Sequence, residues 1–558
     1  MKQVTQTLKN GEITVNDVPL PALKDKFILV KNSYSVISSG TEKTKIDMGK
    51  KNLIDKARAR PDLVKQVLKK FKNDGLTKTF NTVKSRLESP SPLGYSCAGE
   101  VIAIGGLVED IQVGDMVACG GADYANHAEY VAVPKNLVVK IPDGVSTSDA
   151  AFATVGSIAL QGVRLSEAKI GETFLVIGLG LIGQITSQIL KSSGCNVVGL
   201  DIDEALIDQA KEYGVVSTNY ENCENICKNL TDGHGVDGVL ICAGTSSNEP
   251  IDLSGKVTRE KGRVIVVGAV NMNIPRDDYF KKEISVVISR SYGPGRYDAS
   301  YEENGNDYPY GYVRFTEKRN MKTFLEMISN KQINIQSLVT HNFDINDAAK
   351  AYNLIEGNRN EHYMGILLNY KSSKSNNSFK IKYKGYDNIN DNLKVSFYGA
   401  GNYATASLLP VMIKHKINLS GVVTGSGRTA EAVAKKFNFN FCSSSFNDLL
   451  DKKTDIIMIT SRHNDHAKLV YESLRSGKHV YVEKPLALNF EELSKIYNLY
   501  KDKKIPSLMV GFNRRFSKHV ELISQHLNSE SQSMVINIRV NAGQISDEHW
   551  IQNPQIGG

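Results

Sequence analysis

The sequence has few of the features that mark secreted, disulfide-linked or membrane-spanning proteins. Its seven cysteines are scattered and include no Cys-x-x-Cys pair, so we expect neither a disulfide framework nor a structural zinc site. No apolar run approaches the roughly 20 residues that a membrane-spanning helix needs. The N-terminus also lacks the long apolar core of a signal peptide. These absences predict a cytoplasmic protein.

Positive charge is concentrated in one segment of the chain. The formal net charge is +8, and residues 50–86 hold twelve basic residues against three acidic ones, which accounts for the whole imbalance. Apolar residues recur there at helical spacing, which predicts an amphipathic helical insertion over residues 48–90. Its basic face is either a solvated surface or a docking surface for an anionic substrate or membrane headgroups. The segment lacks the aromatic platforms of single-strand binders, so we expect no nucleic-acid partner.

The length of 558 residues predicts three or four folding units. Residues 174–201 read as a strand, a glycine-rich turn, a helix and a second strand that ends in an acid. A second unit of the same kind begins at residue 393. The stretch 371–392 between them is rich in Lys, Asn and Ser, which predicts an interdomain linker.

The first glycine loop has the pattern Gly-x-Gly-x-x-Gly at Gly178, Gly180 and Gly183, after a strand and before a helix. In this context the glycines allow a tight turn, close approach of a pyrophosphate and close packing of helix on strand. The helix N-terminus supplies free N–H groups and positive potential. Asp201 closes the second strand, where its carboxylate can accept both ribose hydroxyls and would repel a 2′-phosphate. The loop therefore predicts NAD(H) binding.

Further stretches extend this pattern. They are ISSGTEK at 37–43, PLGYSCAGEVIAIG at 92–105, VGDMVACGGADYANHAEYVAVP at 113–134 and KGRVIVVGAV at 261–270. On these stretches the chain resembles the medium-chain dehydrogenase/reductase family, the zinc alcohol dehydrogenase superfamily, over residues 1–370. The resemblance implies an α/β protein in which a β-rich, GroES-like catalytic domain embraces a Rossmann domain. The implied boundaries are 1–150 for the GroES-like domain, 151–290 for the Rossmann domain and 291–370 for the return to the catalytic domain.

The chain departs from this family at the catalytic zinc ligands. Where zinc-dependent members have Cys, His-Glu and Cys, it has Ser39, Tyr95 with Ser96, and Ala153. Such a set suits zinc poorly, because zinc prefers thiolate and imidazole ligands. We therefore expect no zinc, and Thr41 and Tyr95 become candidates to polarise a carbonyl or relay an alcohol proton. Packing without a catalytic role is the alternative for both.

Residues 290–320 are dense in Tyr, Gly and Arg and predict a long ordered loop. Arg290, Arg296 and Arg314 alternate with tyrosines, an arrangement that can bind a sugar or phosphate. A surface or subunit-contact loop is the alternative.

The second glycine loop, FYGAGNYA, places Gly399, Gly401 and Ala404 as Gly-x-Gly-x-x-Ala, again between a strand and a helix. Downstream come DIIMITSRHNDHAKLVYESLRSGKHVYVEKPLAL and LMVGFNRRFSKHV. Together these stretches resemble the glucose-fructose oxidoreductase/inositol dehydrogenase family (Gfo/Idh/MocA) over residues 393–558. The resemblance implies a second Rossmann domain at 393–511 and the start of a truncated α/β substrate domain at 512–558.

In that family the Glu-Lys-Pro tip places its lysine beside nicotinamide and substrate, which implies a catalytic role for Lys484. An ammonium at the carboxyl end of a strand can orient a sugar hydroxyl and stabilise negative charge on its oxygen. Glu483 beside it is expected to offset the cost of that charge and to lie near the cofactor. A purely structural Glu-Lys pair is the alternative.

Other residues of the second module carry cofactor and substrate expectations. Thr424, Ser426 and Arg428 stand where an acid would select NAD(H), so NAD(P)(H) is expected here, with Arg428 as the partner of a 2′-phosphate. His466 matches a family position near the cofactor, or else caps its helix. The resemblance places Arg514, Asp547 and His549 on the substrate side.

The sequence therefore predicts a two-module nicotinamide oxidoreductase that acts on a sugar, nucleotide sugar or polyol and forms a homo-oligomer. By analogy with paired architectures of this kind, surface-polysaccharide metabolism is its expected setting. One alternative is a dehydrogenase whose first module alone is active. Another is a redox sensor that binds dinucleotides without turnover.

Overall fold

The computed structural model describes residues 1–59, 61, 64–65, 67, 80, 83–84, 87–357, 361–371, 378–383, 393–501, 505–527, 535, 537–539, 550–554 and 556–557. The chain divides into two compact units. Unit 1 comprises Met1–Asp17, Leu23–Ala59 and Ser91–Asn376, and unit 2 comprises Val18–Ala22, Arg60–Pro90 and Asn377–Gly558. Nearly half of the predicted basic insertion at 48–90 and most of the linker at 371–392 lie outside the described residues.

A β-rich body forms the first part of unit 1. One seven-stranded sheet has the order β15-β16-β3-β5-β6-β8, with β7 paired to β3, and a three-stranded sheet has the order β2-β1-β4. The strands are β1 (Lys2–Thr7), β2 (Ile13–Asp17), β3 (Phe27–Ile37), β4 (Pro90–Pro92), β5 (Ser96–Ile104), β6 (Met116–Gly120), β7 (Tyr130–Pro134), β8 (Val138–Lys140), β15 (Val339–Asp344) and β16 (Gly365–Asn369). Strands from both ends of the first 370 residues thus share one sheet.

The second part of unit 1 is a six-stranded parallel sheet with the order β11-β10-β9-β12-β13-β14. Its strands are β9 (Thr173–Ile177), β10 (Asn196–Leu200), β11 (Val216–Thr218), β12 (Val236–Ile241), β13 (Thr258–Val266) and β14 (Ser285–Ile288). Every residue of β9 is buried, as expected for the central strand of a sheet with helices on both faces. The chain order reverses beside β9, so the carboxyl end of this strand forms a ligand-binding crevice.

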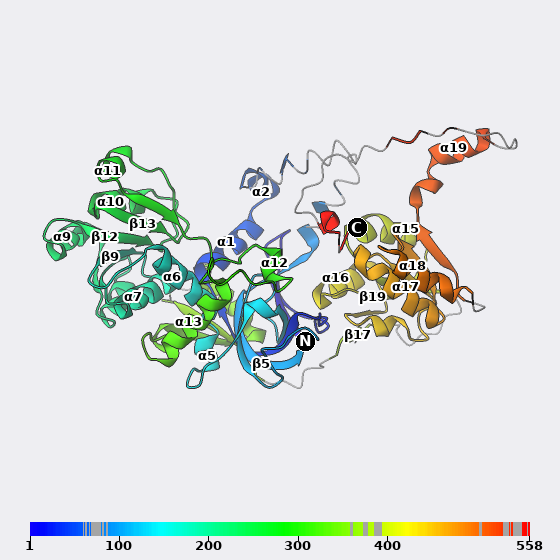
Figure 1. The fold of residues 1–558 in the computed structure, drawn as a ribbon, viewed down its shortest axis with the longest axis horizontal. Helices are drawn as coiled ribbons and strands as arrows, with labels where there is room; N and C mark the ends of the chain where they lie inside the picture. Colours follow the sequence, from blue (N-terminus) through cyan, green and yellow to red (C-terminus); the bar gives the residue numbers. More distant parts are fainter. Residues whose placement is uncertain are drawn as a thin grey trace. The chain divides into compact units, whose positions relative to one another are not determined.

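Helices pack beside the strands of unit 1 (Figure 1). They are α1 (Ser39–Lys50), α2 (Leu53–Ala59), α5 (Thr147–Ala150), α6 (Ala153–Leu165), α7 (Leu181–Ser192), α8 (Glu204–Lys211), α9 (Tyr220–Leu230), α10 (Glu249–Val257), α11 (Arg276–Lys281), α12 (Ala299–Glu302), α13 (Glu317–Ser329) and α14 (Ala348–Ile355). Residues of α6, α7, α13 and the β-rich body share one apolar cluster that includes Tyr95 and Phe174. The two parts of unit 1 therefore pack through a common core.

The loop predicted over 290–320 differs from the structure at two places. Residues 299–302 form the short helix α12, whose N-cap Asp298 accepts a hydrogen bond from the Ser300 amide. Thr316 caps α13 by accepting from the Arg319 amide, so the last residues of the predicted loop are helical. Single capping residues, Asp298 and Thr316, start these two helices, and the composition of the segment as a whole does not reveal them. The irregular stretch therefore ends at residue 316 rather than at 320.

Unit 2 is built on a seven-stranded sheet with the order β17-β20-β19-β18-β21-β22-β23. Its strands are β17 (Lys380–Lys382), β18 (Lys394–Tyr398), β19 (Asn418–Val423), β20 (Phe441–Ser443), β21 (Ile456–Ile459), β22 (His479–Glu483) and β23 (Leu508–Gly511). All the strands are parallel except β17, which pairs antiparallel with β20. Its α-helices are α15 (Leu409–Lys414), α16 (Gly427–Phe437), α17 (His466–Arg475), α18 (Phe490–Leu499) and α19 (Lys518–His526).

A short piece of the N-terminal sequence belongs to unit 2. Val18 and Leu20 are buried, the Leu20 amide donates to the Ser378 carbonyl at 3.3 Å, and the Ala22 amide donates to the Gly425 carbonyl at 3.2 Å. Over the described part of both units, no helix has the length and apolar character needed to cross a membrane.

Candidate functional site

The first glycine loop has the geometry of a dinucleotide cradle. Gly178 has φ of +90°, and a β-carbon there would lie 2.6 Å from the Ala243 amide nitrogen. A β-carbon on Gly183 would lie 1.8 Å from the Gly178 carbonyl oxygen, so the start of α7 sits directly on the turn. Around Gly180, by contrast, no described atom lies within 4 Å of such a β-carbon. The space beside Gly180 at the start of α7 is therefore open to a pyrophosphate.

Asp201 follows β10 and closes the same crevice. Its Oδ2 accepts a hydrogen bond of 2.6 Å from the Leu179 amide in the glycine loop. Its Oδ1 accepts from the amides of Ile202 and Asp203 at 2.7 and 3.0 Å. The carboxylate is thus held at the position where it can also accept ribose hydroxyls.

Tyr95 lies on the turn before β5, with its side chain buried and 8% exposed. Its hydroxyl makes no hydrogen bond of normal geometry with any described residue. Burial raises the pKa of Tyr95 to about 12, and the nearby hydroxyls of Ser38 and Thr41 oppose this rise. Thr41 is exposed on the first turn of α1. The structure thus brings the two predicted residues together, with a buried hydroxyl behind an exposed one.

The positions of the expected zinc ligands do not form a zinc site. The Ser96 hydroxyl donates to the Ala151 carbonyl at 2.6 Å and accepts from the Thr154 amide at 3.2 Å. Ala153 has no ligand atom, and Ser39 offers only a hydroxyl at the start of α1. Among the residues described, no group of three or more His, Cys, Asp or Glu side chains could hold a metal ion. The donor set therefore does not fit zinc.

Two buried residues near Tyr95 were missed by the motif analysis. Glu42 and His127 face each other, with His127 Nε2 3.3 Å from Glu42 Oε2. Glu42 lies inside the quoted motif ISSGTEK and His127 inside the stretch 113–134. The sequence did show a glutamate and a histidine within these two stretches. Because the two residues are 85 positions apart, nothing in their spacing indicated that they would be neighbours.

The arginines of the loop 290–316 are engaged within unit 1. Arg296 donates to Glu302 at 2.6 Å and lies 4.1 Å from the ring centre of Tyr297, which Arg290 approaches at 4.2 Å. Arg314 lies 4.8 Å from the ring centre of Tyr310. These contacts order the loop from within, as expected for cation–π pairs.

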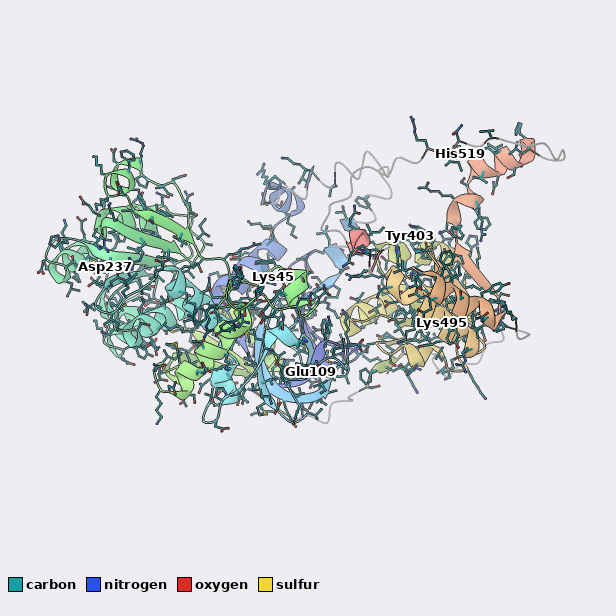
Figure 2. The ribbon with its side chains drawn as sticks, viewed as in Figure 1. Lys45, Glu109, Asp237, Tyr403, Lys495 and His519 are labelled. Carbon is teal, nitrogen blue, oxygen red and sulfur yellow. The ribbon has the colours of Figure 1, made fainter. Side chains whose placement is uncertain are left out.

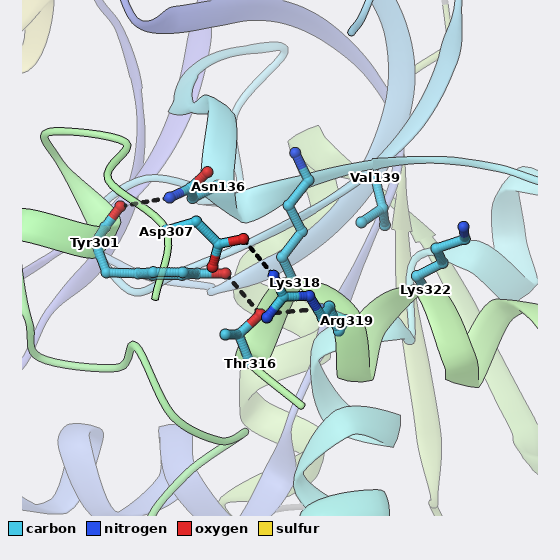
Figure 3. A pocket seen from close by; sticks show the side chains of 8 residues that line it. All are labelled: Asn136, Val139, Tyr301, Asp307, Thr316, Lys318, Arg319 and Lys322. Atoms are coloured by element: carbon cyan, nitrogen blue, oxygen red, sulfur yellow. Dashed lines mark hydrogen bonds and ion pairs between the residues drawn. The ribbon is translucent and has the colours of Figure 1, made fainter. Parts of the chain in front are cut away.

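A pocket of about 300 Å³ lies beside α13 (Figure 3). It is lined by Asn136, Val139, Tyr301, Asp307, Thr316, Lys318, Arg319 and Lys322. Each of its three cations has an acidic neighbour: Lys318 contacts Asp110, Arg319 contacts Asp307, and Lys322 lies 3.8 Å from Glu326. The pocket therefore offers little uncompensated charge to an anion.

The second glycine loop resembles the first in its geometry. Gly399 has φ of +87°, and the Thr460 hydroxyl donates to its carbonyl at 2.6 Å. Gly401 again has no described atom within 4 Å of a β-carbon, and Ala404 is buried at the start of a π-helical turn. Tyr403 next to Ala404 is labelled in Figure 2, and its hydroxyl accepts from Asn513 at 2.9 Å. A pyrophosphate can therefore approach the backbone at Gly401 as it can at Gly180.

The Glu-Lys-Pro tip ends β22, and its two charges are not paired with each other. Glu483 Oε1 accepts from the Tyr481 hydroxyl at 2.5 Å and from the Asn513 amide at 3.0 Å. Lys484 is exposed, and the Lys484–Pro485 bond is cis. β22 ends at Glu483, so Lys484 lies beyond the strand. The expected Glu-Lys ion pair is thus absent from the described contacts of unit 2.

Two histidines lie near the tip. His466, fully buried at the start of α17, approaches the Pro485 carbonyl through Nδ1 at 2.7 Å and the Ser461 carbonyl through Nε2 at 3.3 Å. His463 Nδ1 lies 2.5 Å from the Gly557 carbonyl, and its ring centre lies 4.9 Å from that of Trp550. Burial lowers the pKa of His463, and the charges of His466 and Lys484 lower it further, against the Gly557 hydrogen bond.

The other predicted residues of the second module are placed as follows. Thr424 is buried and donates to the Ser426 carbonyl at 2.6 Å, and Arg428 follows in the first turn of α16. Arg514 is exposed between β23 and α19. Asp547 and His549 lie outside the described residues.

Comparison with protein families agrees with both resemblances. An alcohol dehydrogenase GroES-like domain matches residues 70–143, and a zinc-binding dehydrogenase domain matches residues 182–303. The oxidoreductase family with an NAD-binding Rossmann fold, Gfo/Idh/MocA, matches residues 393–537. The first two matches are to parts of a medium-chain dehydrogenase, and the third is to a Gfo/Idh/MocA domain. The predicted fold class, a GroES-like domain with two Rossmann domains, is confirmed. The protein is a nicotinamide-dependent oxidoreductase that acts on CH–OH groups.

Known relatives match the medium-chain dehydrogenase part. A sorbitol dehydrogenase of Halalkalibacterium halodurans is 27% identical over 305 residues, which cover 48% of this chain and 81% of that protein. A D-guloside 3-dehydrogenase of Escherichia coli is 28% identical over 256 residues, which cover 44% of this chain and 68% of that protein. The solved alcohol dehydrogenase of a Thermus species covers 66% of this chain and 100% of that chain, with a TM-score of 0.51 and 19% identity, and shares its fold.

Proposed function

We propose that the medium-chain dehydrogenase part transfers hydride between NAD(H) and a hydroxyl-bearing carbon of a sugar, nucleotide sugar or polyol. Gly178, Gly180 and Gly183 would hold the pyrophosphate, and Asp201 would bind the ribose and disfavour a 2′-phosphate. The nicotinamide supplies the hydride chemistry when bound, and the protein supplies geometry and a dry crevice.

The observation that carries this proposal is the unpartnered buried hydroxyl of Tyr95. A buried polar group without a partner is costly, so such a group is expected to bind something that enters the site. A substrate oxygen beside Tyr95 and Thr41 would restore the missing hydrogen bond. Because Tyr95 stays protonated at neutral pH, its hydroxyl donates to the oxygen on which negative charge develops.

We further propose that this site works without zinc. Its hydroxyls would replace the Lewis acid as the groups that polarise the reacting carbonyl. Support comes from the Ser96 hydroxyl, which is committed to the backbone of residues 151 and 154, and from Ala153, which has no donor atom.

For the Gfo/Idh/MocA part we propose NAD(P)(H) binding at Gly399, Gly401 and Ala404, with Lys484 as the catalytic ammonium. Arg428 in the first turn of α16 would contact a 2′-phosphate. Glu483 and His466 support this role from nearby positions, since His466 contacts the Pro485 carbonyl directly after Lys484. Arg514, Asp547 and His549 are proposed on the substrate side.

The substrate class follows from the relatives, which include enzymes named for sorbitol and for D-guloside. A sugar or polyol with several hydroxyls is therefore our first choice for this chain. Surface-polysaccharide metabolism is the setting that we propose for it.

The test is a turnover screen of the full chain against polyols, glycosides and nucleotide sugars, with NAD⁺ and NADP⁺ and in both directions. With an active substrate, Tyr95→Phe is expected to lower kcat about 10²- to 10³-fold, because one donor to the developing oxyanion is lost. Tyr130→Phe, also buried in the β-rich body, is the matched control and should change kcat little.

Two bound dinucleotides per chain without turnover of any substrate would instead favour the redox-sensor alternative. Unchanged kcat in Tyr95→Phe would contradict the proposed role of this hydroxyl. Loss of turnover in Lys484→Ala with intact Tyr95 would move the reaction to the second module.

A further inference from the structure

A buried polar network lies directly behind Tyr95. The Glu42 carboxylate, 2% exposed, accepts from the Ser38 amide at 3.1 Å and from the Tyr352 hydroxyl. His127 Nε2 lies 3.3 and 3.4 Å from its two oxygens. Glu42 is therefore a buried carboxylate whose partners come from α1, α14 and the segment before β7.

His127 continues the network away from Glu42. The ring is fully buried, its Nδ1 lies 2.6 Å from the Ser35 hydroxyl, and that hydroxyl lies 2.6 Å from the Tyr370 hydroxyl. If Nε2 donates to Glu42, Nδ1 of the neutral ring accepts from Ser35, and Tyr370 donates to Ser35 in turn. Every group between Tyr370 and Glu42 then has a partner.

The Glu42–His127 pair touches both segments that carry the proposed site. Glu42 holds the amide of Ser38, whose hydroxyl lies near Tyr95. His127 packs on Gly94, the residue before Tyr95, where a β-carbon would lie 2.8 Å from the ring. Displacement of either side chain would therefore shift the Tyr95 hydroxyl or its neighbour.

The setting of the pair argues against simple core packing. A buried carboxylate and imidazole often contribute less to stability than apolar side chains of similar volume would, so their presence here is not explained by packing alone. Other titratable side chains face the pair from the surrounding elements. They are Tyr95 and Cys97 at β5, Tyr352 on α14, Tyr370 after β16, and Glu129 before β7.

We propose that Glu42 and His127 are positioning residues that fix Tyr95, and the start of α1 that carries Thr41, for hydrogen bonding to the substrate oxygen and keep Tyr95 as a donor. The inference rests on the proposed role of Tyr95 in the first module. The mechanism has two parts. The contacts of the pair fix the backbone at Ser38 and at Gly94 relative to each other. The negative charge of Glu42 disfavours a second negative charge on the Tyr95 oxygen.

The test that needs no substrate follows the ionisation of Tyr95. The ring Cζ resonance of Tyr95, in the full chain labelled at tyrosine Cζ with carbon-13, is assigned by its loss in Tyr95→Phe and titrated with pH. Glu42→Gln, which keeps the shape of the side chain and removes its charge, is expected to lower the titration midpoint of Tyr95. Glu42→Asp retains the negative charge, so its Tyr95 titration midpoint should lie close to that of the wild type.

Glu172→Gln is the matched control. It removes a partly buried ion pair with Arg263 elsewhere in unit 1 and should leave the Tyr95 titration unchanged. A Tyr95 midpoint that is equal in wild type and Glu42→Gln overturns the inference, whether or not any substrate is turned over.

The kinetic test uses the polyol or sugar that gives turnover in the screen. Glu42→Gln and His127→Asn are expected to lower kcat at least tenfold with KM changed less than about threefold, because orientation in the transition state is lost rather than binding. In both variants the fall of kcat at high pH should also begin at a lower pH than in the wild type. A raised KM with unchanged kcat contradicts the inference.

If no substrate in the turnover screen reacts, the proposed function is contradicted. The Tyr95 titration still tests the role of Glu42 and His127, because it needs no substrate. If His127→Asn does not fold, Glu42→Gln alone carries the test through both readouts.

Discussion

Glu317 is a buried carboxyl whose two oxygens have no hydrogen-bond partner among the described residues. Burial and, to a smaller extent, the charge of Glu302 raise the pKa of Glu317, and Arg296 opposes them, so that the pKa is about 9. In the folded protein the group is therefore protonated at neutral pH. In the unfolded chain it ionises near its ordinary value of 4.5.

This difference links the stability of unit 1 to pH. Between about pH 4.5 and 9 the folded state binds more protons than the unfolded state, so the free energy of unfolding falls as pH rises. We expect Glu317→Gln to remove this dependence and to stabilise the protein by roughly 1 to 3 kcal/mol at pH 8, with little effect at pH 4.5. Urea unfolding at both pH values measures it.

Glu302→Gln is the contrasting variant for that experiment. Glu302 is paired with Arg296, so its loss leaves a buried guanidinium with a missing partner. We expect Glu302→Gln to destabilise the protein at both pH values. Equal stability of wild type and Glu317→Gln at pH 8 would contradict the assignment of Glu317 as a buried neutral acid.

At the scale of single residues, the sequence predicted those candidate site residues that lie within short motifs. The glycines, Asp201, Tyr95 and Lys484 lie within the stretches singled out from the sequence, and the structure places them at strand ends or turns. His127 and Glu317 escaped because their environment comes from segments far apart in the chain. The Glu483 carboxylate accepts from Tyr481 and Asn513, and no described contact pairs it with Lys484.

At the element scale each glycine loop joins a buried strand to a helix and leaves one open position. Gly180 and Gly401 have room for a β-carbon, so Gly180→Ala and Gly401→Ala should fold normally. In each variant, however, the new methyl group occupies the space proposed for a pyrophosphate. We expect each to weaken one of two NADH-binding events at least tenfold, a loss of about 1.4 kcal/mol.

Isothermal calorimetry of the full chain measures this effect, and thermal unfolding checks the fold. Gly106→Ala serves as the control, since a β-carbon at Gly106 also meets no described atom and lies away from both loops. Binding of NADH unchanged in Gly180→Ala would rule out the first loop as a cofactor site.

Element types were predictable wherever the pattern was long and regular, as in β9 with α7 and in β18 with the turn after it. The short helix α12 and the start of α13 were missed, because single capping residues rather than periodicity set them. The antiparallel strand β17 was also missed, since its three residues lie in a stretch that the composition marks as linker.

At the scale of the whole molecule, the proposed absence of zinc can be measured. We expect metal analysis of the purified full chain to find far less than one zinc per chain. Treatment with a strong chelator should leave turnover unchanged, because no catalytic position of the first module offers thiolate or imidazole. One stoichiometric zinc that is lost together with activity would overturn the proposed metal-free site.

The contacts of residues 18–22 decide how this protein can be divided. Leu20 and Ala22 bond to residues 378 and 425, Ser444 donates to the Leu20 carbonyl, and Gly427 packs so closely on Pro19 that a β-carbon would lie 2.0 Å from its carbonyl oxygen. A cut at 371–392 would therefore strip the second unit of an internal segment. For the same reason, genetic exchange of either half at that linker would part residues 18–22 from the rest of the second unit, with which they pack.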